Sequence, residues 1–344
     1  MKLEIELLRV ETAFPFRIAR GSKQTRDVFV VTLADGGVTG IGEAAPQEFY
    51  GETPLTVRGA INAIGRLIDA DPADVQQRLN EAGADLHEAL RPHASVRAAL
   101  DMALWDLRGR REGAPVWQLI GADPAQAPVT SFTIGFDRPD VIDAKVDAAG
   151  AYRILKVKVG LPGDLEIVER VIARSGKTVR ADANEGWDLE TALEKTLELY
   201  RHGVEFCEQP LPHGDEDGLR QLKRLSPLPI VLDESIVDAT DVERCHDQGH
   251  AINIKLMKCG GITPALRMVE AARAHGLRVM IGCMLETSLG VTAAAHISPL
   301  ADWADLDGNL LLADDPFEGV RVEGGRLVLP ETPGLGVRRR ATRR

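Results

Sequence analysis

The sequence lacks the features of a nucleic-acid-binding protein, a thiolate metal site or a membrane protein. Its 344 residues carry 41 Lys and Arg against 52 Asp and Glu, a net charge of −11, whereas a nucleic-acid-binding surface would be basic. The four cysteines form no CxxC pair, so a zinc cage of thiolates is disfavoured. No uninterrupted apolar run has the length of a signal peptide or a membrane span. We therefore expect a cytoplasmic protein with no nucleic-acid or membrane partner.

The acidic surplus has two interpretations. In most proteins it only keeps the surface well solvated, but some of the carboxylates can also converge on a cation. Five of the last seven residues are arginine, and we assign this C-terminal tail no function. The positions of the acidic residues along the chain decide between the two interpretations.

Residues 1–125 have the pattern of a small α+β domain. Alternating residues at 3–7, the β-branched run at 28–33 and residues 38–41 after the turn at Asp35-Gly36 indicate antiparallel strands. From Pro54 to about Arg111 the apolar spacing is helical. We expect this segment to be a capping domain.

Residues 126–315 repeat a unit of one short apolar strand and one amphipathic helix. Eight such strands predict a parallel sheet closed as a (β/α)8 barrel of the TIM type. An open doubly wound sheet is the alternative, but no Gly-x-Gly-x-x-Gly follows a first strand. Residues 316–344 read as a β return that packs on the capping domain and ends in the arginine-rich tail. The expected barrel strands are 129–134, 154–159, 178–182, 204–208, 230–233, 252–258, 279–285 and 303–307.

Charged residues close five successive strands of the expected barrel. They follow one another at intervals of 24, 26, 25 and 25 residues, which is about one βα unit each. Their side chains would emerge around one mouth of the barrel, where the active sites of this fold are built. Solvated strand ends would explain one or two such positions but not five. The five residues are Lys158, Asp182, Glu208, Asp233 and Lys258.

The three carboxylates of this set indicate a metal site. Asp182, Glu208 and Asp233 would raise one another's pKa values unless a cation lay between them. Oxygen ligands alone select a hard ion, so we expect Mg²⁺ rather than Zn²⁺. Asn184 and Glu234 could orient these ligands, or they could be ordinary loop residues.

The lysines indicate acid/base chemistry. Lys156 and Lys158 are two residues apart and face the same side of their strand. Lys255 and Lys258 are three apart and face opposite sides, and we expect Lys258, the later one, to lie nearer the mouth. Strands two and six are opposite one another in a ring of eight. Lys158 and Lys258 would then flank one substrate carbon, as a racemase or epimerase requires.

A further pair of carboxylates ends the eighth strand. Asp305 and Asp307 are two residues apart and lie far in sequence from the metal ligands. Two anions facing the cavity would suit a substrate ammonium group. A polar strand end or a helix cap would give the same pattern.

These motifs together resemble the enolase superfamily, in its muconate-lactonizing-enzyme subgroup. The resemblance rests on Lys-x-Lys at 156–158, Asp-Ala-Asn at 182–184, Glu-Gln-Pro at 208–210, Asp-Glu-Ser at 233–235 and Lys-x-x-Lys-x-Gly-Gly at 255–261. Within the subgroup the chain is most similar to dipeptide epimerases, in particular the L-Ala-D/L-Glu epimerases of murein peptide recycling. That similarity rests on Asp305-x-Asp307 and on the segments 18–22, 50–52, 99–107 and 282–285.

The resemblance implies a function for each site residue. Lys158 and Lys258 would be the acid/base pair in a 1,1-proton transfer through an enediolate, with one Mg²⁺ per subunit held by Asp182, Glu208 and Asp233. Lys156 would support the substrate carboxylate, while Asp305 and Asp307 would receive the α-ammonium group of a dipeptide. Arg20 would meet the side-chain carboxylate of a glutamate. A homo-oligomeric assembly is also compatible with the sequence. Thr133, Cys283 and Leu285 would line the pocket.

Other activities stay open at this stage. The o-succinylbenzoate synthases and muconate-type cycloisomerases share the metal set but do not need an aspartate pair for an ammonium group. A barrel lysine could also form a Schiff base, as in an aldolase. A binding protein without catalysis would need no facing lysines.

Overall fold

The N-terminal part of the chain folds as an antiparallel sheet covered by helices. The computed structural model describes residues 1–18, 21–71 and 73–341. Strands β1 (Lys2–Ile18), β2 (Gly21–Asp35) and β3 (Val38–Ala44) form the sheet in the order β1-β2-β3. The expected strands lie inside these longer ones, with the predicted turn between β2 and β3. The antiparallel cap is therefore confirmed.

Helices cover one face of this sheet and enclose its own hydrophobic core. They are α1 (Pro54–Ala70), α2 (Val75–Asn80), α3 (Asp85–Ala89) and α4 (Ala94–Glu112). Phe29 and Leu33 of β2 are fully buried together with Ile61 and Ile64 of α1. A Cβ atom on Gly42 of β3 would lie 2.0 Å from the Ala99 carbonyl oxygen, so this glycine allows α4 to pack directly on β3. The short helix α5 (Val116–Leu119) leads toward the barrel.

Eight parallel strands form the barrel, as the sequence predicts. Their order follows the chain from β4 to β11, and a parallel bridge between Thr130 and Ala304 joins the two ends of the sheet. The strands are β4 (Phe132–Ile134), β5 (Ile154–Lys158), β6 (Thr178–Asp182), β7 (Cys207–Glu208), β8 (Ile230–Leu232), β9 (Ala251–Lys255), β10 (Arg278–Gly282) and β11 (Trp303–Asp305).

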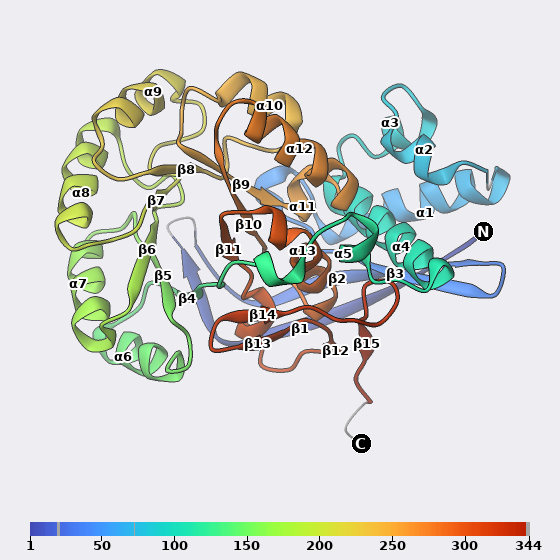
Figure 1. Cartoon of the computed structure of the whole chain (residues 1–344), viewed down its shortest axis with the longest axis horizontal. Helices are drawn as coiled ribbons and strands as arrows, with labels where there is room; N and C mark the ends of the chain where they lie inside the picture. Colours follow the sequence, from blue (N-terminus) through green and yellow to red (C-terminus); the bar gives the residue numbers. More distant parts are fainter. Residues whose placement is uncertain (19–20, 72, 342–344) are drawn as a thin grey trace.

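Helices alternate with the barrel strands and surround them on the outside (Figure 1). Their apolar faces bury residues such as Val168 and Leu199 against the sheet. Among the described helices, none combines the length and apolar character that a membrane span requires. The helices are α6 (Pro139–Ala148), α7 (Asp164–Ser175), α8 (Leu189–Arg201), α9 (Glu216–Leu225), α10 (Ala239–Cys245), α11 (Leu256–Cys259), α12 (Ile262–Ala274) and α13 (Ser288–Ile297).

One strand boundary differs from the prediction in a way that changes the site. The expected strand 252–258 ends at Lys255, and the next residues form the helical turn α11. The strands at 278–282 and 303–305 also end before the predicted bounds. Lys258 therefore does not close a strand, whereas Lys255 does.

The C-terminal segment returns along both parts of the molecule. Strands β13 (Arg321–Glu323) and β14 (Arg326–Val328) form a hairpin, and β12 (Phe317–Glu318) pairs with β15 (Arg338–Arg339). The Leu335 amide donates to Asp106 Oδ1 on α4 at 2.8 Å. Arg339 forms an ion pair with Glu6 on β1 at 2.5 Å. These contacts join the return segment to the capping domain.

Candidate active site

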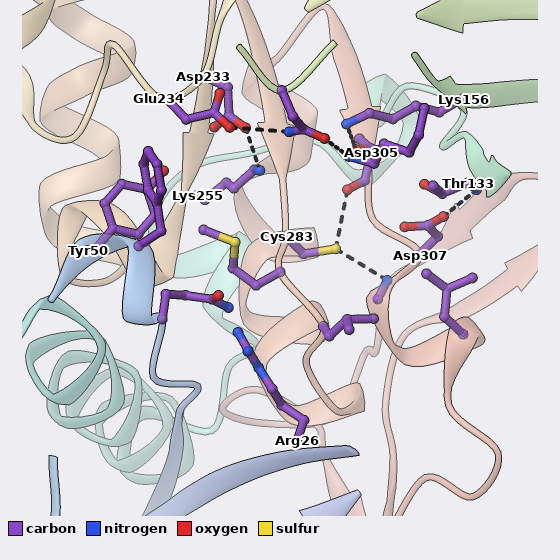
Figure 2. A pocket seen from close by; sticks show the side chains of 18 of the residues that line it. Arg26, Tyr50, Thr133, Lys156, Asp233, Glu234, Lys255, Cys283, Asp305 and Asp307 are labelled. Carbon is purple, nitrogen blue, oxygen red and sulfur yellow. Dashed lines mark hydrogen bonds and ion pairs between the residues drawn. The ribbon is translucent and has the colours of Figure 1, made fainter. Parts of the chain in front are cut away.

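A cavity of about 520 Å³ lies between the mouth of the barrel and the capping domain (Figure 2). Barrel residues at or near the carboxyl ends of strands form one wall. Capping residues from β2 and the 3-10 helix at Glu48–Tyr50 form the opposite wall. Of the predicted site residues, the following line this cavity: Thr133, Lys156, Lys158, Asp233, Cys283, Leu285, Asp305 and Asp307.

The structure brings the three predicted carboxylates together. Asp182 is the last residue of β6 and Glu208 the last of β7, and the two are direct neighbours across the parallel pair. Asp233 follows the end of β8, and its charge acts on both of the other carboxylates. All three side chains are buried. Strand register thus makes Asp182 and Glu208 neighbours, and Asp233 follows the next strand at the same edge of the barrel.

Two lysines of β5 lie against this group of acids. Lys156 Nζ is 2.9 Å from Asp182 Oδ2, 2.7 Å from Glu208 Oε2 and 2.6 Å from Asp305 Oδ2. Lys158 Nζ is 2.6 Å from Asp182 Oδ2. Both lysines line the cavity, as their two-residue spacing predicts.

On the opposite side of the barrel, Lys255 and not Lys258 reaches the cavity. Lys255 is the last residue of β9, lines the cavity and lies 2.7 Å from Asp233 Oδ2. Lys258 lies on α11 with its side chain fully buried, and its Nζ donates to Asp233 Oδ1 and to the Asp233 carbonyl oxygen, both at 2.6 Å. The prediction that Lys258 lies nearer the mouth is wrong because the strand gives way to a helical turn after Lys255.

The electrostatics of the group favour an added cation. Burial, Asp182 and Asp233 raise the pKa of Glu208 to about 8, against the opposing effect of Lys156. Burial alone would raise the pKa of Asp182, but Lys156 and Lys158 outweigh it and hold that pKa below its usual value. The positive charge of the lysines therefore outweighs the effect of burial on the pKa of Asp182, but not on the pKa of its neighbour Glu208. A bound divalent cation would let all three acids ionise.

The donor set fits Mg²⁺. Glu208 Oε2 is buried and makes no hydrogen bond, although Lys156 Nζ lies nearby. The lysines occupy the space between the acids, so the described residues contain no preformed cluster of three His, Cys, Asp or Glu ligands. Three carboxylates without histidine or thiolate are nonetheless the oxygen ligands that a hard divalent ion selects. Asp182, Glu208 and Asp233 are the residues that would hold it.

Two polar residues that the sequence reasoning missed hold these acids in place. Gln209 accepts from the Asp233 amide at 2.9 Å and from the Ser235 amide at 3.2 Å through one side-chain oxygen. Asn253 Nδ2 donates to Glu208 Oε1 at 2.8 Å. Asn253 lies two residues before Lys255 in the same strand, and this spacing was the available signal.

Asn184 connects Lys158 on β5 to Glu234 after β8. Its side-chain oxygen accepts from Lys158 Nζ at 3.1 Å, and its Nδ2 donates to Glu234 Oε1 at 3.2 Å. Asn184 and Glu234 also line the cavity. Both residues therefore belong to the wall of the cavity, and their role in orienting the acids stays a prediction.

The two aspartates at the end of β11, Asp305 and Asp307, differ in their surroundings. Asp305 accepts from Ser131 Oγ and forms an ion pair with Lys156, each at 2.6 Å. Asp307 accepts from the Thr133 amide at 2.6 Å. Burial and the charge of Asp305 raise the pKa of Asp307 to about 7. Among the described residues, Asp307 forms no ion pair like that between Asp305 and Lys156. A substrate ammonium group would supply the missing positive charge.

The remaining predicted residues divide between the cavity wall and an undescribed segment. Cys283 and Leu285 line the cavity, and Cys283 Sγ contacts the Asp305 carbonyl oxygen and the Gly308 amide, each at 3.3 Å. Arg20 lies outside the described residues. The capping wall includes Arg26 and Tyr50, neither of which was predicted as a site residue.

Comparison with known proteins settles the family. Residues 2–121 match the mandelate racemase / muconate lactonizing enzyme N-terminal domain, and residues 140–342 match the enolase C-terminal domain-like family. The chain belongs to the mandelate racemase / muconate lactonizing enzyme family of the enolase superfamily. The family resemblance inferred from the sequence is confirmed.

Three proteins that are similar to this chain over nearly its whole length are named epimerases. The L-Ala-D/L-Glu epimerase of Bacteroides thetaiotaomicron is 38% identical over 98% of this chain and 88% of the relative. A hydrophobic dipeptide epimerase of Roseobacter litoralis is 39% identical over 98% of each chain. The dipeptide epimerase of Enterococcus faecalis, solved with Mg and L-Leu-L-Tyr, has a TM-score of 0.89 and 31% identity over 98% of each chain. These names place the protein among the isomerases of the family.

Proposed function

We propose that this protein is a Mg²⁺-dependent dipeptide epimerase, specifically an L-Ala-D/L-Glu epimerase, which inverts the α-carbon of the C-terminal residue. The observation that carries the proposal is the position of Lys158 and Lys255. They end strands β5 and β9, four strands apart in a ring of eight, and both line one cavity. A 1,1-proton transfer needs one proton acceptor and one proton donor on opposite faces of a carbon.

The other charged residues of the barrel provide attachment points for a dipeptide. Lys156, which contacts Asp182, Glu208 and Asp305, supports the substrate carboxylate at the metal side of the cavity. Asp307, together with Asp305, receives the α-ammonium group. Asp182, Glu208 and Asp233 would hold Mg²⁺, and the bound ion would supply positive charge that stabilises the carboxylate oxygens of the substrate.

The lysines carry the proton. One of the pair, in its neutral form, takes the α-proton and gives an enediolate of the substrate. The second lysine donates a proton to the opposite face, so the configuration at this carbon inverts and both amino groups exchange protonation states. Asn184 orients Lys158 and Asp233 orients Lys255 through the hydrogen bonds described above. Return of solvent protons to the lysines resets the pair.

The surroundings of the lysines and aspartates favour this reaction over the alternatives. A cycloisomerase or an o-succinylbenzoate synthase has no ammonium group to bind, yet Asp307 is buried at the cavity without a cationic partner among the described residues. A Schiff-base reaction needs only one lysine at the substrate. The cavity instead presents two, Lys158 and Lys255, from opposite strands of the barrel.

The proposal is tested by incubating a dipeptide library with the protein and Mg²⁺ in D₂O. We expect L-Ala-L-Glu to gain one deuterium at the C-terminal α-carbon and to yield L-Ala-D-Glu, measured by mass spectrometry and chiral analysis. The Lys158→Ala, Lys255→Ala double variant is the control and should give neither product. Deuterium at another carbon, product formation without inversion or trapping of substrate by borohydride would contradict the proposal.

A further inference from the structure

The loops that carry the three carboxylates are joined through one residue, Gln209. It directly follows Glu208 and is fully buried. Its backbone amide donates to the Val231 carbonyl oxygen at 2.9 Å, which continues the pairing of β7 with β8 by one residue. Its backbone carbonyl oxygen accepts from the Glu185 amide at 2.8 Å, in the loop that follows Asp182. The main chain of Gln209 therefore connects the ends of β6, β7 and β8.

The side chain of Gln209 reaches the third carboxylate. Its Oε1 atom accepts from the amides of Asp233 and Ser235, as described above. Its Nε2 atom donates to the Leu211 carbonyl oxygen and to Ser235 Oγ, each at 2.9 Å. An amide side chain has two acceptor positions and two donor hydrogens, and all four are used here. Because Oε1 faces backbone donors and Nε2 faces acceptors, the side chain is held in one orientation.

The backbone around Gln209 adopts a conformation that only surrounding contacts can maintain. Its φ angle is +34°, and those of Asn184 and Glu185 in the neighbouring loop are +44° and +67°. Among the described non-glycine residues, Asp74 alone also has a positive φ angle. Left-handed backbone is unfavourable for a residue with a Cβ atom and persists where other contacts enforce it. The hydrogen bonds between the two loops are such contacts, so they specify the shape of the loops.

A fixed arrangement of the loops matters because the three carboxylates repel one another. All three are buried, and the charges of Asp182 and Asp233 both raise the pKa of Glu208. Loops that could move would carry these charges apart, and each arriving ion would have to reassemble its ligands. Mg²⁺ requires short bonds in a nearly ideal octahedron, whereas the larger Ca²⁺ accepts irregular and flexible sites. A rigid link between the loops therefore benefits the smaller ion more.

We propose that Gln209 is the positioning residue of the metal site and that its link between the three loops gives the site a preference for Mg²⁺ over Ca²⁺. The inference rests on the proposed function, because it takes Asp182, Glu208 and Asp233 to hold the ion. Gln209 is not among the described residues that line the cavity. It acts on the ion only through the three carboxylates.

The test titrates the metal-free protein with Mg²⁺ alone and with Ca²⁺ alone by isothermal titration calorimetry. In Gln209→Met, which keeps the length of the side chain but loses the amide, the dissociation constant for Mg²⁺ should rise about 50-fold. That for Ca²⁺ should rise less than about fivefold. Ser235→Ala is a milder change that removes only the hydroxyl group bound by Gln209 Nε2. It should raise the Mg²⁺ constant about fivefold.

Gln248→Met is the matched control. Gln248 is also a fully buried glutamine, but it precedes β9 and so lies at the opposite end of the barrel from the carboxylates. This variant should leave both dissociation constants unchanged. Thermal unfolding of all variants in EDTA measures any loss of stability that does not involve the metal.

Two outcomes would overturn the assignment. An equal rise of both constants in Gln209→Met would mean a purely structural role, and unchanged constants would mean that the loops hold the carboxylates without this residue. Absence of Mg²⁺ binding in the wild-type protein would disprove the metal site itself and the assignment with it. If the wild-type protein binds Mg²⁺ but inverts no dipeptide, the epimerase proposal fails alone. A lost preference for Mg²⁺ in Gln209→Met would then still support the assignment.

Discussion

The two walls of the cavity carry charge in different ways. On the barrel wall, each of Lys156, Lys158 and Lys255 has a carboxylate partner at 2.6 to 2.7 Å. On the capping wall, the guanidinium group of Arg26 has no partner among the described residues. The paired charges of the barrel wall can hold a metal ion and transfer protons. The unpaired charge of the capping wall can distinguish one ligand from another. We therefore expect changes in the barrel wall to affect all dipeptides alike and changes in the capping wall to alter their ratio.

Removal of either cavity lysine should have the largest effect. Lys158→Ala and Lys255→Ala should each lower the rate of epimerisation by at least about 1000-fold, because each removes one of two proton carriers. The loss should be equal for L-Ala-L-Glu and L-Ala-L-Gln. Each variant should still exchange the α-proton of one configuration, and the two variants should differ in which one. Proton NMR in D₂O with L,L and L,D substrates measures this, and a variant that keeps full epimerisation would remove its lysine from the pair.

Chelation of the metal should come next. Dialysis against EDTA should lower exchange by about 100-fold or more for every dipeptide, because the substrate oxygens lose the positive charge that stabilises them. Added Mg²⁺ should restore the rate, and Asp233→Asn should shift the restoring concentration upward. Full activity in EDTA would contradict a metal-dependent reaction at these carboxylates.

Lys258→Met should lower the reaction rate less than the changes above. It distinguishes the roles of Lys255 and Lys258, the two lysines that contact Asp233. Lys258 does not reach the cavity, and Asp233 keeps Lys255 when Lys258 is removed. We expect a roughly tenfold rise in the Mg²⁺ concentration needed for half-maximal rate, with kcat at saturating Mg²⁺ reduced less than about fivefold. A loss as deep as that of Lys255→Ala at saturating Mg²⁺ would show that Lys258 is the proton carrier after all.

The barrel wall could largely be predicted from the sequence because its residues are fixed by local rules. Asp182 and Glu208 end short strands, and parallel register then makes them neighbours whatever the loops between them do. The same local rules give a wrong prediction for Lys258, because they assume that the strand continues to that residue. Alternation within Asn253 to Lys258 does not reveal where a strand ends and a helical turn begins, and the turn after Lys255 moves every later side chain.

The capping wall could not be predicted because its residues acquire their environment from tertiary packing. Arg26 stands in a strand beside Asp27, a pattern that suggests a solvent-exposed edge. Its burial arises only when the capping sheet closes over a barrel whose mouth is formed by residues more than 100 positions later in the chain. No spacing rule connects these segments, so the uncompensated charge is visible only in the folded protein.

The junction between the two walls should govern stability rather than activity. Glu43 on β3 is fully buried and accepts from the Thr287 amide at 3.0 Å and from the Thr287 hydroxyl group. Burial raises the pKa of Glu43 to about 7, against the opposing effect of these hydrogen bonds. Because the folded state binds the proton more tightly than the unfolded chain, this contribution to stability is complete below about pH 4.5 and disappears as the pH rises through 7.

Glu43→Gln should remove that pH dependence because glutamine does not titrate, while its oxygen can accept from the Thr287 amide and its NH₂ group can donate to the Thr287 hydroxyl oxygen. Between pH 5 and pH 8.5 in EDTA, the wild-type free energy of unfolding should fall by on the order of 2 kcal/mol more than that of the variant. Urea unfolding at both pH values measures the difference, with the exposed Glu331→Gln as control. Parallel slopes in wild type and variant would show that Glu43 is ionised in the folded protein. A changed ratio of L-Ala-L-Glu to L-Ala-L-Gln turnover in Glu43→Gln would instead mean that the junction takes part in selection, and the separation between the two walls would no longer hold.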